Sequence, residues 1–278
     1  MRWLITTLVV YALAGGLASA QERVVSIGGD LTEIIYLLGE EDRLVATDTT
    51  SVYPQAALET PKVGYVRRLS AEGVLSVEPD MILVSGAAGP EPAVEQLEAS
   101  GVKMISLPTE YTPASILRKI DVVSKALGVP EKGAALRMQV EADIARAEAT
   151  IEQLDIAPRI LFFTSSAGAP RSAGTETAAH GVILMLNGVN VFGNQTGYRA
   201  LSLEAAVTAD PDVILVMGHS AARLGGVEGL KEHPALALTN AAKQDRIIAI
   251  DAAKTMQFGP RTPEAIAEVA AELAAVLN

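Results

Sequence analysis

The sequence has no cysteine, few aromatic residues and fewer basic than acidic residues, and each shortage excludes a class of protein. Without cysteine, the chain has no disulfide framework, thiolate metal site or cysteine nucleophile. A net charge of −11 argues against a nucleic-acid partner, because phosphate binding requires positive charge. Only three histidines are present, so few side chains are available as general bases. These shortages disfavour nucleic-acid binding and nucleophilic catalysis.

The motifs of common enzymes are also missing. The sequence has no Gly-x-Ser-x-Gly elbow, no Walker lysine and no His-Glu-x-x-His helix. Gly28-Gly29 and Gly86–Gly89 more readily turn the chain than cradle a phosphate, because glycine is the usual turn residue. Among the histidines, His180 falls inside an expected helix and His233 in a loop, whereas His219 follows an expected strand and is a candidate for a cleft. No catalytic set assembles from these residues, and we expect a protein that is not an enzyme.

Residues 1–20 have the pattern of a cleaved secretory signal. Arg2 provides a basic start, residues 4–13 an apolar run, and Ala18-Ser19-Ala20 a small-residue cleavage site. The run is shorter than the roughly 20 apolar residues that a membrane span requires. No cysteine stands at the site to carry a lipid anchor, so we expect a free periplasmic protein with no direct membrane insertion.

An internal repeat is the strongest organising feature of the chain. The segment 69–86 recurs without a gap as 201–218, at a constant offset of 132 residues, with shared Leu, Ser, Glu, Pro, Asp, Ile, Val and Gly. A Gly-Tyr pair precedes each copy, Gly64-Tyr65 in the first and Gly197-Tyr198 in the second. Two units of one design predict two lobes and a ligand cleft between them.

Strands and helices are expected to alternate in both halves of the chain, which indicates α/β architecture with parallel sheets. We expect an N-terminal lobe over residues 21–112, a helical bridge over 113–157 and a C-terminal lobe over 158–278. Within the bridge, residues 130–154 carry an apolar stripe at helical spacing. The fold class predicted is therefore α/β, with two parallel-sheet lobes related by the repeat and bridged by a long, rigid helix.

Tyr65 is the strongest candidate for a ligand-binding side chain. It lies in a loop beside Arg67 and Arg68, and positive charge next to a phenol favours its deprotonated form. A phenolate is a hard oxygen donor that suits ferric iron, and tyrosine is a known axial ligand of haem. Arginine also offers a fork for carboxylates. From composition alone, however, a surface tyrosine with solvated arginines explains the segment better than a ligand does.

The sequence resembles the periplasmic haem-binding proteins that feed haem ABC importers, a branch of the helix-bridged family that includes receptors for vitamin B12 and ferric siderophores. The likeness extends over essentially the whole chain after residue 20, and the Gly-Tyr-x-Arg segment is its most specific part. The segments that carry it are 64–76, 173–179, 197–202, 225–230 and 258–263.

The resemblance implies a role for several residues. Tyr65 corresponds to the axial ligand of haem iron, with Arg67 and Arg68 supporting the ligand and its propionates. Glu72 and Glu204, which match in the repeat, correspond to the pair that docks the lobes onto an inner-membrane ABC permease dimer. Each glutamate also lies in the first turn of an expected helix, where it complements the helix dipole whether or not it docks.

The second lobe departs from some relatives, because its loop 164–170 lacks a histidine that would ligate iron. We therefore expect ferric haem b, as transported ligand, to be five-coordinate on Tyr65; no catalytic cofactor is expected. Because phenylalanine is scarce, leucine, methionine and alanine should line the cleft, Met256 near Phe258 among them. Possible second-lobe contacts are Ser165, Ser166, Arg171, Tyr198, Arg199 and His219.

Three hypotheses follow. The leading one is a monomeric periplasmic receptor that binds haem and delivers it to an ABC permease for haem and iron uptake. A cobalamin or ferric-siderophore receptor of the same fold is the alternative, although cobalamin does not need a phenolate and a siderophore already saturates its iron. An exported α/β hydrolase is the alternative from another class, and it requires a nucleophile and base that the sequence does not supply.

Overall fold

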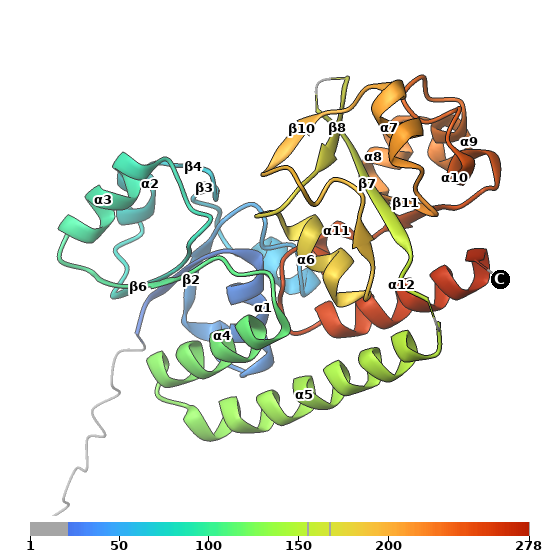
Figure 1. Ribbon diagram of the computed structural model, residues 1–278. Coiled ribbons are helices and arrows are strands. Elements are labelled where there is room, and N and C mark those ends of the chain that lie inside the picture. The colour runs from blue at the N-terminus through green and yellow to red at the C-terminus, as the bar shows by residue number, and fades with distance from the viewer. Residues whose placement is uncertain (1–21, 155, 167, 278) are drawn as a thin grey trace, which may run out of the picture.

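The computed structural model describes residues 22–154, 156–166 and 168–277. Within these ranges it contains two main sheets, one in each half of the chain, and a separate two-stranded one (Figure 1). The signal predicted at residues 1–20 lies outside the described residues. Within the described ranges, no helix combines the length and apolar character that a membrane crossing requires.

The N-terminal half is built on a four-stranded, fully parallel sheet in the order β2-β1-β5-β6. A two-stranded hairpin, β3–β4, stands apart from this sheet. The strands are β1 (Val24–Ile27), β2 (Leu44–Thr47), β3 (Gly64–Tyr65), β4 (Arg68–Leu69), β5 (Met81–Ser85) and β6 (Lys103–Leu107). The helices are α1 (Gly29–Leu37), α2 (Ala71–Leu75) and α3 (Glu91–Ala99), with 3₁₀ turns at Glu41–Arg43 and Gln55–Glu59.

Two consecutive helices connect the halves, as the sequence predicts. They are α4 (Pro113–Ala126) and α5 (Pro130–Glu152), and α5 packs against both α4 and the C-terminal helix α12 (Thr262–Leu277). With 23 residues, α5 is about 35 Å long at 1.5 Å per residue. Figure 1 shows it running beneath both halves, on the side opposite β3–β4 and β10.

The C-terminal half has a mixed sheet, which differs from the purely parallel sheet expected. Its order is β10-β8-β7-β11-β12, with β9 paired to β7, and β8 and β10 run antiparallel to their neighbours. We expected a loop over residues 164–170, but β7 extends to Ser166 and the chain returns as β8. The strands are β7 (Arg159–Ser166), β8 (Ala169–Ala173), β9 (Val189–Asn190), β10 (Tyr198–Ala200), β11 (Val213–Met217) and β12 (Ile247–Ile250). The helices are α6 (Ala178–Met185), α7 (Leu203–Ala209), α8 (Gly218–Arg223), α9 (Gly226–Lys231), α10 (Asn240–Lys243) and α11 (Ala252–Thr255).

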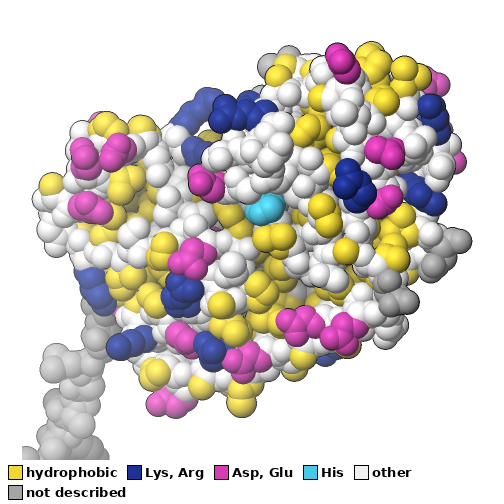
Figure 2. Space-filling view, in the orientation of Figure 1, with side chains coloured by type: hydrophobic (Ala, Val, Ile, Leu, Met, Phe, Trp, Pro, Cys, Tyr) yellow, Lys and Arg dark blue, Asp and Glu magenta, His cyan; other side chains and the backbone are white. Residues whose placement is uncertain are grey.

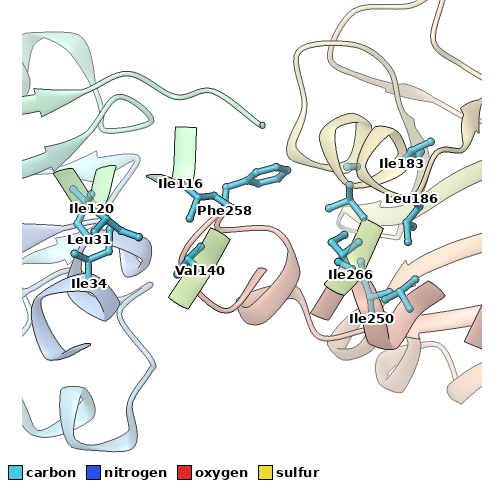
Figure 3. Close-up of a cluster of buried hydrophobic side chains, with 14 of the residues drawn as sticks. Leu31, Ile34, Ile116, Ile120, Val140, Ile183, Leu186, Ile250, Phe258 and Ile266 are labelled. Atoms are coloured by element: carbon cyan, nitrogen blue, oxygen red, sulfur yellow. The ribbon is translucent and has the colours of Figure 1, made fainter. Parts of the chain in front are cut away.

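One buried apolar cluster crosses from one half to the other. Leu31 and Ile34 of α1 belong to it, and so do Val140 of α5 and Ile266 of α12. Figure 3 shows Phe258 and Val140 between the groups that the two halves contribute. Because this core is continuous, burial of apolar surface holds the halves together. The domain boundaries at residues 112 and 157 stay a prediction.

Helix caps confirm the repeat in three dimensions. Ser70 Oγ accepts the amide hydrogen of Gly73 at 3.3 Å, and Ser202 Oγ accepts that of Ala205 at 3.1 Å, so both serines are N-caps. From the sequence, Asp30 or Thr32 is the expected N-cap of α1, and this prediction is wrong. Gly28 precedes α1, and no side chain caps that helix.

Candidate functional site

A cleft lies between the two halves, and residues of both line it. It encloses about 470 Å³, within the usual range of small-molecule sites. Most of its walls follow the carboxyl ends of parallel strands, where ligands sit in open α/β sheets. The residues from the N-terminal half and α4 include Gly28, Gly29, Asp30, Val52, Tyr65, Val66, Arg67, Ser85, Ala87, Leu107, Glu110, Tyr111 and Lys119. Those from the C-terminal half include Ala178, Tyr198, Met217, His219, Ala252, Ala253, Met256, Gln257 and Phe258.

The β3–β4 hairpin presents Tyr65 and Arg67 to the cleft. Gly64, with a φ of 111°, sets the backbone before Tyr65, and the Tyr65 side chain is 42% exposed while lining the cleft. Arg67 lies in the hairpin turn and also lines the cleft. Arg68 is paired with Tyr65 across the hairpin and is exposed, but it is not among the described lining residues.

Two further tyrosines, Tyr111 and Tyr198, enter the same cleft. Burial raises the pKa of both phenols, and the positive charge of Arg67 opposes the rise in each case. Both are therefore neutral hydrogen-bond donors at neutral pH. Tyr111 could not be identified from the sequence, because it precedes α4 in a segment without a distinctive motif.

The other second-lobe candidates are divided between the cleft and its surroundings. His219, in the first turn of α8, is exposed and lines the cleft. Ser165 and Arg171 lie on the β7–β8 hairpin and are not among the described lining residues. Arg171 donates a hydrogen bond to the Tyr198 carbonyl and is one of two arginines whose charge acts on the Tyr198 phenol.

Ser166 ends β7, and its side chain lies outside what the structure describes. Arg199 is paired with Ser172 on β8, whereas Tyr198 is paired with Ala173. Because successive strand residues point to opposite faces, Arg199 is directed away from the face that carries Tyr198. The structure therefore does not bring Arg199 into the described cleft lining.

A buried ion pair forms part of the cleft floor. Lys119 Nζ of α4 lies 2.6 Å from Asp30 Oδ2 of α1 and donates to the Phe258 carbonyl at 2.7 Å. Each of the two charged side chains is only 9% exposed. The lysine therefore joins the N-terminal half to the segment that precedes α12, and no sequence pattern pointed to this contact between distant positions.

A second set of polar contacts reinforces the same junction. Arg261 donates its backbone amide and its Nε to the Glu33 carboxylate, at 2.9 and 3.0 Å. Its guanidinium also lies 3.3 Å above the centre of the Tyr53 ring, a cation–π contact. Gln257 Nε2 donates to the Thr50 carbonyl at 3.0 Å. The short segment 257–261 thus binds three separate parts of the N-terminal half.

The cleft walls are mainly apolar, with positive charge at one edge. Met217, Met256 and Phe258 line them, as the scarcity of aromatic residues led us to expect for Met256. Figure 2 shows Lys and Arg side chains gathered at the top of the molecule, between the two halves. Such a site suits an apolar ligand with an anionic edge, because arginine binds carboxylates while the walls exclude water.

Glu72 and Glu204 lie outside the cleft, in the first turns of α2 and α7. Both are exposed, and neither makes an ion pair with another described residue. Figure 1 shows α2 and α7 in different halves of the molecule, both on the side opposite α5. Both carboxylates are accessible to a partner.

Comparisons with known proteins agree with this architecture. A solved structure described as the periplasmic haem-binding protein RhuT from Roseiflexus sp. RS-1 is 35% identical, covers 93% of this chain and 100% of its own, and superposes with a TM-score of 0.87. A vitamin B12-binding protein of Vibrio parahaemolyticus is 27% identical over 89% of this chain and 88% of its own. A protein of Bacillus subtilis, YvrC, is described as an uncharacterized ABC transporter substrate-binding lipoprotein. It is 24% identical over 90% of this chain and 79% of its own length. The family profile described as periplasmic binding protein matches residues 24–253. The chain belongs to this family of periplasmic substrate-binding proteins.

Proposed function

We propose that this protein binds ferric haem in the inter-lobe cleft and delivers it to an ABC permease. The observation that carries the proposal is the position of Tyr65: an accessible phenol at the cleft beside Arg67, while Tyr111 and Tyr198 are neutral donors. The Tyr65 oxygen is the axial ligand of haem iron, a role that tyrosine performs in other haem proteins. Similarity to RhuT supports haem as the ligand.

Each wall of the cleft has a task in this proposal. Arg67, assisted by Arg68 at the edge of the hairpin, stabilises the phenolate and binds the propionates, because a guanidinium pairs with carboxylates through two parallel hydrogen bonds. Met217, Met256 and Phe258 contact the porphyrin faces. The bound haem is cargo and is released unchanged, so the protein needs neither turnover nor a catalytic cofactor.

Glu72 and Glu204 dock the protein onto the two subunits of an inner-membrane permease. Two exposed carboxylates that match in the repeat suit a partner with two equivalent basic sites. The protein is then a periplasmic monomer whose signal has been removed. Similarity to an ABC transporter substrate-binding lipoprotein supports this class of partner.

Cobalamin is the second candidate ligand, because vitamin B12-binding proteins resemble most of the chain. The Tyr65–Arg67 pair favours haem, since cobalamin needs no phenolate ligand. A ferric siderophore is disfavoured for the reason that its iron is already coordinated. A hydrolase is the weakest hypothesis, because the chain belongs to a family of binding proteins.

Absorption titration of the protein lacking residues 1–20 with ferric haem tests the proposal. We expect a saturable Soret change with a high-spin, phenolate-type charge-transfer band, and loss of both in Tyr65→Ala. Arg199→Ala is the matched control, because Arg199 is an exposed arginine on β10 and is not among the described lining residues. Saturable binding of cobalamin without binding of haem would show that cobalamin, and not haem, is the ligand.

A further inference from the structure

Each copy of the repeat contains an arginine that the cleft does not use. Arg23 immediately precedes β1, and Arg159 is the first residue of β7. These are equivalent strands, since β1 is paired with β5 and β7 with β11 in the same parallel register. Both arginines bind the chain that leaves the helix carrying a proposed docking glutamate, α2 or α7.

In the first half, Arg23 donates three hydrogen bonds. Its Nε donates to the Glu78 carbonyl at 2.9 Å and its Nη2 to the Val77 carbonyl at 2.6 Å. Its backbone amide donates to Asp80 Oδ2 at 2.8 Å. Glu78 has a φ of 48°, so the chain turns in the left-handed region just after α2.

The second half repeats every one of these contacts. Arg159 Nε donates to the Asp210 carbonyl at 3.3 Å, and its Nη2 donates to the Ala209 carbonyl at 2.7 Å. Its backbone amide donates to Asp212 Oδ2 at 2.7 Å, and Asp210 has a φ of 43°. The acceptors lie 132 positions after those of Arg23, which is the offset of the sequence repeat.

These contacts bear on how α2 and α7 are held. The helices have only five and seven residues, too few to be stable by themselves. Each guanidinium donates to carbonyls at or just beyond the negative end of its helix, where a cation is favoured. The serine N-cap, next but one to the glutamate, fixes the opposite end. Each short helix is thus capped at its N-terminus by a serine and joined at its C-terminal end to the neighbouring strand by an arginine.

We propose that Arg23 and Arg159 are positioning residues for permease docking, because they hold α2 and α7 so that Glu72 and Glu204 are presented at a fixed separation. The inference rests on the proposed docking role of the two glutamates. It adds that each docking helix is positioned by an arginine at the start of the neighbouring strand.

The absence of cysteine makes a direct test possible, since Glu72→Cys and Glu204→Cys create the only two sites for nitroxide labels. Pulsed electron–electron double resonance should give one narrow distribution of the distance between the two labels in the otherwise native chain. In the Arg23→Gln and Arg159→Gln double variant, we expect a distribution about twice as wide, because the carbonyls lose bonds to a charged donor. An unchanged width would overturn the inference.

Arg246→Gln is the matched control. Arg246 also donates from Nε to a carbonyl, that of Val276 at 3.1 Å, but contacts neither docking helix. The control should keep the narrow distribution. Circular dichroism and haem titration of each variant show whether the fold is retained, and Arg23→Lys with Arg159→Lys should recover part of the narrow width.

A docking measurement separates this inference from the proposed function. The probe is a haem ABC permease in lipid nanodiscs whose ATPase the unchanged protein stimulates. Glu72→Gln with Glu204→Gln should abolish the stimulation. Normal stimulation would show that the glutamates do not dock, and the inference would fall with that role.

If the glutamate variant is defective, the arginine double variant should need roughly tenfold more protein for half-maximal stimulation, while its haem titration stays unchanged. If the arginine double variant reaches half-maximal stimulation at the same concentration as the unchanged protein, the positioning role is overturned, while docking through the glutamates stands.

Discussion

The two halves share a frame but differ where they meet the ligand. In both, a serine caps a short helix and an arginine binds the carbonyls after it. Tyr65, however, lies on a separate two-stranded hairpin and is 42% exposed, whereas Tyr198 begins β10 of a six-stranded sheet and has a pKa raised by burial. The same Gly-Tyr pair thus occupies two chemical environments.

The physical cause of the difference is the β7–β8 hairpin of the second half. It adds an antiparallel strand beside β7, and β10 pairs with that strand. Tyr198, on the paired strand β10, is partly buried against the main apolar cluster, whereas Tyr65 lies on the β3–β4 hairpin apart from the main sheet. The comparison teaches that the repeat preserves the supporting frame, and that the edge of each sheet determines what its tyrosine can do.

The largest expected effect comes from removing Lys119, which pairs with Asp30 and binds the Phe258 carbonyl of the other half. Lys119→Met leaves the Asp30 carboxylate buried without its partner, which costs about 3–5 kcal/mol in the free energy of unfolding. Denaturant unfolding measures this loss. Asp30→Asn combined with Lys119→Met removes both charges and should recover most of it. An unchanged unfolding midpoint in Lys119→Met would show that this buried pair does not stabilise the folded protein.

The next largest effect is the difference in haem affinity between variants of Tyr65 and Tyr198. Tyr65→Phe should weaken ferric-haem binding by at least about 100-fold, because even changes to the partners of metal ligands cost 10- to 100-fold. Tyr198→Phe removes one neutral donor and should weaken binding by less than about tenfold. Parallel absorption titrations measure both. Equal losses would mean that the halves contribute equivalent ligands.

The stability of the ligand-free protein at alkaline pH also tests the difference between the two tyrosines. Burial raises the pKa of Tyr198 above its ordinary value of 10.0, so the unfolded chain loses this proton first as pH rises. The resulting stability is present below pH 10.0 and is lost as pH increases through the raised pKa. Urea unfolding across this range should show a decline that Tyr198→Phe reduces. Tyr111→Phe should act in the same direction, and a decline identical in all three proteins would contradict the assignment.

The smallest expected effect concerns His219. If Tyr65 alone ligates the iron, His219→Ala should change haem affinity by less than about fivefold, the size of an exposed contact. The spectrum should stay high-spin. A low-spin spectrum that becomes high-spin in His219→Ala would instead identify this histidine as a second iron ligand.

Much of the frame could be predicted from the sequence because it depends on local signals. The repeat, the caps at Ser70 and Ser202 and the two bridging helices follow from spacing and side-chain type, and the structure confirms them. The hairpin at residues 159–173 could not, since its serines and proline also fit a loop. Tyr111 was missed because its place in the cleft depends on α4 and α6, which are brought together only by folding.

The sequence by itself determined the two-part α/β organisation, the long connecting helix and the prominence of Tyr65, because periodicity, capping and turn residues act over short distances. Only the tertiary structure decided which side chains share the cleft. It placed His219 at the lining, turned Arg199 away, and paired Asp30 with Lys119 across 89 positions. Contacts of that kind depend on the register of strands and the packing of helices, which no local pattern encodes.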